Sequence, residues 1–175
     1  MSKSALDAIR TQVMWNRLIA VVEEQAQSLL RTAFGTITRE AGDLSAGVYD
    51  TEGNMIAQAM TGTPGHVNTM ATAVAHFFKL YPQSTMKPGD VFLMNDTYLT
   101  EGSIGHLPDV CSTVPVFHDG QVVAYIQAFG HHDDIGGRVP GSMPGTAVTV
   151  FEEGLAIPPV RLYDAGVRND AVFTI

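Results

Sequence analysis

The alternation of hydrophobic and polar residues divides the chain into helical and strand-like segments. Between residues 5 and 33, apolar side chains such as Ile9, Val13, Val22 and Leu29 recur close to the period of a helix. This spacing predicts one long amphipathic helix at the start of the chain.

Shorter elements follow this helix. The stretch "LSAGVYDTEGNMIAQAM" is typical of two short strands around a turn at residues 50–54. A second helix is predicted over about 66–80, and Pro82 ends it. "MKPGDVFLMND" indicates a turn and a buried strand near residues 90–94, followed by a glycine-containing loop at 97–109.

The clearest strand signal is a pair of runs, "VCSTVPVF" and "QVVAYIQAF", joined by "HDG". Asp119-Gly120 is the kind of dipeptide that favours a two-residue hairpin turn. An uninterrupted hairpin around this turn places Asp109 opposite Gly130 and His131 beside Pro108. The far ends of both runs are therefore expected to lie together.

The chain after residue 136 is predicted to be a loop followed by short strand-like pieces. "GGRVPGSMPG" holds four glycines and two prolines, which disfavours any regular element. Together the pattern predicts an α+β fold, in which a long N-terminal helix and a second helix pack on mainly antiparallel hairpins. No repeat or linker is evident, so residues 1–175 are expected to form a single domain.

Composition and charge narrow the classes of partner. The net charge is −8 and no run of Lys or Arg occurs, which argues against a nucleic acid or an anionic membrane as partner. The low charged fraction of 16% fits either a surface that meets another subunit or a glycine-rich enzyme domain. With Cys111 as the only cysteine, no signal peptide and no long apolar run, a cytoplasmic location is expected.

Two short segments, "GHLPDV" and "GHHDDIGG", concentrate the histidines and aspartates of the chain. The predicted hairpin brings these segments together, with six candidate side chains: His106, Asp109, His131, His132, Asp133 and Asp134. Imidazole and carboxylate without thiolate are ligands for first-row divalent metals. A hydrogen-bonded polar end of a hairpin is the alternative interpretation.

Adjacent residues of a strand point to opposite faces, so one of His131 and His132 is expected to bind metal and the other to act beside it.

Other chemistry finds less support in the sequence. His66, at a helix start, is either a surface residue or part of the site, whereas His76 and His118 are expected to be structural or solvated. No P-loop or GxGxxG motif occurs, so nucleotide phosphates are not expected to bind here. No GxSxG motif occurs either, so serine hydrolase chemistry finds little support.

Several motifs resemble the hydantoinase B family, whose members include subunits of ATP-dependent hydantoinases, of 5-oxoprolinases and of acetone and acetophenone carboxylases. The motifs are "LLRTAFGTITREAGDLSAGVYDTEGNMIAQ", "NDTY…GHLPDV", "VPVFHDGQVVAY", "HHDDIGGRVPGSMPG" and "EGLAIPPVRLYDAG". They occur in order over nearly the whole chain, which is similar to the N-terminal part of a longer subunit. The loop "NDTYLTEGSIGHLPDV" departs from the usual "NDPY.GGTHLPD", lacking the proline and being about three residues longer.

The resemblance implies a division of labour between two subunits. A hydantoinase A-like ATPase partner would bind ATP and phosphorylate the substrate, and this chain would complete the reaction with a divalent metal such as zinc, manganese or iron. The implied metal ligands are His106, Asp109, His131, Asp134 and Asp43. His132 and His66 are the implied acid/base residues.

The motifs "HHDDIGG" and "GSMPG" resemble the hydrolase branch more than the carboxylase branch. The resemblance therefore implies ATP-dependent hydrolysis of a cyclic amide first, within a hetero-oligomer acting on a small molecule. ATP-dependent carboxylation of a ketone is the alternative within the family. A structural subunit that performs no chemistry is the alternative from a different class.

Overall fold

The computed structural model describes residues 3–175, including all side chains in that range except those of residues 3 and 67–71. Its elements run in the order α1 (Lys3–Thr32), α2 (Thr36–Arg39), β1 (Leu44–Tyr49), β2 (Met55–Gln58), α3 (His66–Leu80), β3 (Val91–Met94), β4 (Asp109–His118), β5 (Gln121–His131), β6 (Val160–Asp164), β7 (Val167–Arg168) and α4 (Asp170–Phe173). Short 3-10 turns lie at Gln83–Thr85, Pro140–Ser142 and Val150–Glu152.

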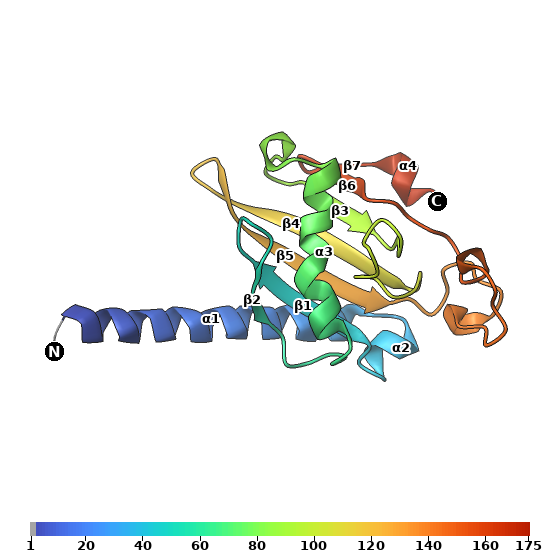
Figure 1. Ribbon diagram of the computed structural model, residues 1–175, viewed down its shortest axis with the longest axis horizontal. Coiled ribbons are helices and arrows are strands. Elements are labelled where there is room, and N and C mark those ends of the chain that lie inside the picture. Colours follow the sequence, from blue (N-terminus) through green and yellow to red (C-terminus); the bar gives the residue numbers. More distant parts are fainter. Residues whose placement is uncertain (1–2) are drawn as a thin grey trace.

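The strands form one sheet with the order β2-β1-β5-β4-β3-β6-β7, and all neighbouring pairs are antiparallel. Together with the helices this confirms the predicted α+β fold (Figure 1). The loop expected after residue 136 is interrupted by the turn at Pro140–Ser142, in which Gly141 and Ser142 both adopt positive φ. None of the described helices is both long and apolar enough to cross a membrane.

Helix α1 covers one face of the sheet with its C-terminal half only. Val22 and Ala26 pack on Leu44, Ala46 and other apolar side chains of β1, β2 and β5. The N-terminal half extends past the sheet into solvent (Figure 1). The sheet therefore covers the apolar face of this amphipathic helix over only part of the length of the helix.

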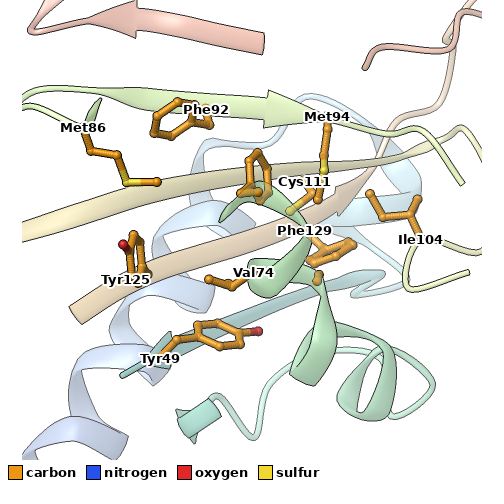
Figure 2. Packing of buried hydrophobic residues seen from close by; sticks show 11 residues of the cluster. Tyr49, Val74, Met86, Phe92, Met94, Ile104, Cys111, Tyr125 and Phe129 are labelled. Carbon is orange, nitrogen blue, oxygen red and sulfur yellow. The ribbon is translucent and has the colours of Figure 1, made fainter. Parts of the chain in front are cut away.

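Helix α3 crosses the opposite face of the sheet, and the largest hydrophobic core lies beneath it (Figures 1 and 2). Val74 and Phe77 of this helix belong to one buried cluster with Tyr49, Cys111 and Phe129 of the strands. Because strand side chains alternate between faces, Leu44 and Ala46 face α1 while Ser45 and Tyr49 face α3. The same alternation directs residues at the ends of β4 and β5 toward α3.

The register of the β4–β5 hairpin differs by one residue from the regular hairpin expected around Asp119-Gly120. The turn itself is as predicted, since Asp119 and Gly120 both have positive φ. A bulge beside Phe117 leaves Val123 without a directly opposed partner, so that Asp109 pairs with His131 instead of Gly130. Residues that face each other point to the same side of a sheet, so the bulge places Asp109 and His131 on one face.

A candidate metal centre at the end of the central hairpin

His106, Asp109 and His131 form a compact group at the end of β4 and β5. One potential ligand atom from each of the three lies within 4.8 Å of the others. His106 lies in the loop directly before β4, and its Nε2 lies 3.1 Å from Asp109 Oδ2. The rings of His106 and His131 meet edge to face, with their centroids 5.0 Å apart. The structure thus brings together three of the residues predicted as metal ligands.

His66 and Asp43 extend this group on the α3 side. His66 is the first residue of α3, and its Nε2 lies 3.5 Å from Asp109 Oδ2 and 3.6 Å from Asp43 Oδ1. The other ring nitrogen, Nδ1, lies 3.2 Å from Ser45 Oγ. Five predicted site residues from four separate stretches of the sequence therefore share one location.

Several ligand atoms of the group are buried without a hydrogen-bond partner. Asp109 is 5% exposed and His131 is 2% exposed. Within the part of the chain that the structure describes, Asp109 Oδ1 and both ring nitrogens of His131 have no hydrogen-bond partner. A buried polar atom left unpaired costs about 1–3 kcal/mol, so this arrangement favours an additional occupant that carries positive charge. The donor set of imidazole and carboxylate fits a divalent cation.

Charge interactions within the group shift its pKa values in opposite directions. Burial alone would raise the pKa of Asp109, but its contacts with His106 and His66 hold the pKa well below its usual range. The pKa of His66 and that of His106 are both raised, chiefly by hydrogen bonding to Asp109 and against the effect of burial. The buried carboxylate and the two histidines therefore favour one another's charged forms.

The remaining residues of the "HHDD" segment lie outside this group. Asp134 is exposed, and its Oδ1 accepts a hydrogen bond from Gly136 N at 2.8 Å. Asp133 caps α2, because its carboxylate accepts hydrogen bonds from the backbone N–H groups of Thr36 and Ile37. His132 is at the surface, although partial burial of its ring lowers its pKa. Of the four residues in the segment, the structure brings only His131 into the centre.

The other histidines and the cysteine lie away from the centre. His76 is on α3 beside Lys79, and burial together with that charge lowers its pKa. His118 lies in the hairpin turn beside Asp119. Cys111 is fully buried in the core, where burial raises the pKa of its thiol and keeps it protonated. These placements agree with the structural or solvated roles expected for them.

Glu153 supports the centre and was not recognised from the sequence. Its Oε2 accepts a hydrogen bond from Leu107 N at 3.1 Å, and its charge acts on His106. Asn95 holds the same residue from the other side, since its Nδ2 donates to Leu107 O at 2.7 Å. Both side chains thereby fix the turn between His106 and Asp109. They are too far along the chain for any local spacing rule to have found them.

The loop that leads into α3 is also held by distant residues. Glu23 of α1 accepts hydrogen bonds from Met60 N at 3.0 Å and from Thr61 N at 3.1 Å. Two residues further, Thr63 Oγ1 donates to Asp43 Oδ1 at 2.6 Å. This chain of contacts connects α1 to the carboxylate beside His66.

An α+β fold with a buried histidine and carboxylate group at one hairpin end defines a candidate metal-dependent protein. The chain belongs to the hydantoinase B/oxoprolinase family, whose pattern it matches over residues 7–175. It is 34% identical over 168 residues to a 5-oxoprolinase from Dictyostelium discoideum, an alignment that covers 95% of this chain and 13% of that protein.

Two solved structures are similar to this fold over most of its length. The nucleotide-free acetone carboxylase superposes with a TM-score of 0.82 at 24% identity, covering 95% of this chain and 22% of that one. The ATP-dependent caprolactamase from Pseudomonas jessenii gives a TM-score of 0.76 at 28% identity, covering 94% and 28%. Against the curated relatives that it matches first, this chain spans only 12–13% of their length.

Proposed function

We propose that this chain supplies the metal-binding part of an ATP-dependent enzyme that hydrolyses cyclic amides, of the hydantoinase or 5-oxoprolinase type. The observation that carries the proposal is the buried group of His106, Asp109 and His131, whose ligand atoms lie within 4.8 Å of one another. Buried atoms of this group lack hydrogen-bond partners among the described residues, which costs free energy of folding unless a ligand binds to them.

In this proposal His106, Asp109 and His131 hold zinc, manganese or iron, and Asp43 is the fourth ligand. When bound, a divalent cation acts as a Lewis acid that polarises an amide or phosphoryl oxygen. Glu153 and Asn95 keep the turn around Leu107 in place, which would hold His106 and Asp109 in position to bind the cation. Asp134 is not included, because its carboxylate is exposed and hydrogen-bonded within its own turn.

His66 is the first candidate for moving a proton. Its contact with Ser45 Oγ orients the ring, and its Nε2 faces the carboxylates of Asp43 and Asp109. From that position Nε2 would hold a proton and transfer it to the leaving nitrogen of the amide. His132, at the surface of the same hairpin end, is the second candidate for this role.

ATP would be bound by a hydantoinase A-like partner subunit, since no phosphate-binding motif occurs in this sequence. Phosphorylation of the amide oxygen by that partner would make the ring carbonyl easier to attack. The likeness to an ATP-dependent caprolactamase supports hydrolysis of a ring amide. The likeness to acetone carboxylase concerns the fold, and ATP turnover that requires bicarbonate would instead favour ketone carboxylation.

Metal content of the untagged chain, measured by plasma mass spectrometry, tests the proposed centre. We expect about one equivalent of zinc, manganese or iron in the wild type, whether alone or co-expressed with the ATPase, because the ligand set is preformed. His106→Ala and His131→Ala should lose this metal. His118→Ala is the matched control, since His118 lies in the exposed hairpin turn. A well-folded wild type without metal in both preparations would refute the centre.

A structural subunit without chemistry remains the competing function, and the assembled complex distinguishes the two. If His131→Ala abolishes metal binding but the assembled enzyme keeps its full rate of ATP-dependent hydrolysis, the centre has no catalytic role. Loss of hydrolysis with an intact complex supports catalysis by this chain. Complex formation is followed by size-exclusion chromatography with light scattering.

A further inference from the structure

A groove of about 600 Å³ opens beside the proposed centre. It lies between the loop that precedes β4 and the segment around the last 3-10 turn, with Tyr98, Gly105, Val148 and Glu153 among its lining residues. Gly105 is the neighbour of His106, and Glu153 holds Leu107 N. The groove therefore adjoins the centre through both walls, and its volume is within the usual range for small-molecule sites.

The lining of the groove is mixed, and its apolar part is exposed. Tyr98 is 76% exposed and Val148 is 89% exposed, although both are large hydrophobic residues. Ile104, Ala147 and Val150 add further apolar lining. Exposed apolar side chains that converge on one groove favour a ligand with apolar surface of its own.

The charges around the groove are acidic. Glu101 and Glu153 are the charged residues of the lining, which contains no Lys, Arg or His. Lys79 lies 2.6 Å from Glu101 and offsets its charge, so Glu153 is the carboxylate that acts on a ligand. Asp43 and Asp109 together would offset a divalent cation, which leaves the charge of Glu153 unbalanced beside the centre.

We propose that this groove binds the ring of an uncharged cyclic amide and disfavours a ring that carries a carboxylate. The inference rests on the proposed function and narrows it, because it favours uncharged cyclic amides over the carboxylated ring of 5-oxoproline at that same site. The apolar side chains of the lining contact the methylene groups of the ring, and the amide lies at the side of the groove formed by Gly105. A carboxylate on the ring would approach Glu153 without a cation in the lining to pair with, which weakens its binding.

Two lactams that differ by a single carboxylate test this inference: 2-pyrrolidinone and 5-oxoproline. Each is titrated into the isotope-labelled, zinc-loaded chain, and the amide resonances of the groove residues are followed by NMR. We expect 2-pyrrolidinone to shift the resonances of Gly105 and Thr149, and 5-oxoproline to bind about tenfold more weakly because of like-charge repulsion.

Glu153→Gln keeps an oxygen acceptor for Leu107 N and removes the charge. It should therefore narrow the difference in affinity between the two lactams to about twofold. Glu52→Gln, in the distant β1–β2 turn, is the matched control and should leave the difference unchanged. Equal or tighter binding of 5-oxoproline to the wild type would overturn the inference, as would no shift with either lactam. A chain that binds no zinc would instead refute the proposed centre.

Discussion

At the scale of single residues, the proposed centre is a set of side chains that leave some of their buried polar atoms without hydrogen bonds. Asp109 is buried between His106 and His66, while His131 lies behind them with both ring nitrogens unpaired among the described residues. Each unpaired buried atom opposes folding by about 1–3 kcal/mol. A bound cation would remove this cost, so metal binding and stability are expected to be linked.

The metal-free protein should show a specific dependence of stability on pH through His106. The pKa of His106 is raised above its ordinary value of 6.5, chiefly by its hydrogen bond to Asp109. Its stabilising contribution is thus fully present below pH 6.5 and is lost as the pH rises through the higher folded-state pKa. The melting temperature of His106→Gln should lie furthest below that of the wild type near about pH 6, and the gap should shrink toward about pH 8.

Calorimetry of both proteins in the presence of a chelator measures this gap. The comparison with a variant is necessary because His76 and His132 have lowered pKa values and act with the opposite sign. Those two contributions are the same in both proteins and cancel in the difference. A gap that is constant or widens as the pH rises would contradict the role of the His106–Asp109 contact.

At the scale of elements, the centre depends on contacts between parts that are distant in sequence. The segment around Glu153 is tied to residues 135–138 by hydrogen bonds from Arg138 N to Glu152 O and from Leu155 N to Ile135 O, both 2.9 Å long. A Cβ at Gly154 would lie 2.4 Å from Ile135 O, so only glycine permits this approach. The loop therefore presents Glu153 to the turn around Leu107.

Helix α1 supports the same centre from the opposite side through Glu23. Glu23→Ala removes the acceptor of Met60 N and Thr61 N, which should release the loop that carries Thr63 to Asp43. We expect the affinity for zinc to fall by about tenfold, as is common when residues that orient metal ligands are removed. Competition with a chromophoric chelator measures this affinity.

Glu24→Ala is the control for this variant. Glu24 is the next residue on the helix, but it is exposed and pairs with Arg31 at 2.6 Å. Its removal should leave zinc affinity unchanged. If both variants bind zinc as the wild type does, the contact of Glu23 only holds the loop in place and does not set the geometry of the centre.

At the scale of the whole molecule, the sheet is covered by α3 on one face and by half of α1 on the other (Figure 1). The projecting half of α1 exposes Ile9 by 51%, Val13 by 50% and Met14 by 65%. These residues contribute little to the stability of the described fold, because burial of apolar surface is what stabilises a helix in a protein.

A chain that begins at Asn16 should therefore keep the stability of the longer one. We expect its melting temperature to change by less than about 4 °C, equivalent to roughly 1 kcal/mol or less for a protein of this size. Differential scanning calorimetry makes the measurement. Val22→Ala, in the packed half of α1, is the positive control, because Val22 is fully buried and its truncation leaves a cavity. A large loss of stability in the shortened chain would mean that the projecting half is packed in solution.

The sequence by itself determined the two long helices, the central hairpin and the neighbourhood of the centre, but not the short helices α2 and α4. The two helices, the Asp119-Gly120 turn and the convergence of "HLPD" with "HHDD" depend on residues close together in the chain, whose periodicity and turn chemistry can be read directly. His106, Asp109 and His131 were predicted for this reason, and the structure brings them together.

Only the tertiary structure decided which side chains meet. The bulge at Val123 shifts the register by one residue, and because strand side chains alternate with a period of two, it turns His131 to the face of Asp109. Asp134 lies outside the centre because β5 ends at His131 and the Asp134 carboxylate accepts a hydrogen bond from Gly136 N within its own turn. Glu23 accepts a hydrogen bond from Met60 N, 37 residues along the chain, and Glu153 accepts one from Leu107 N, 46 residues away. Only packing of the folded chain sets such contacts.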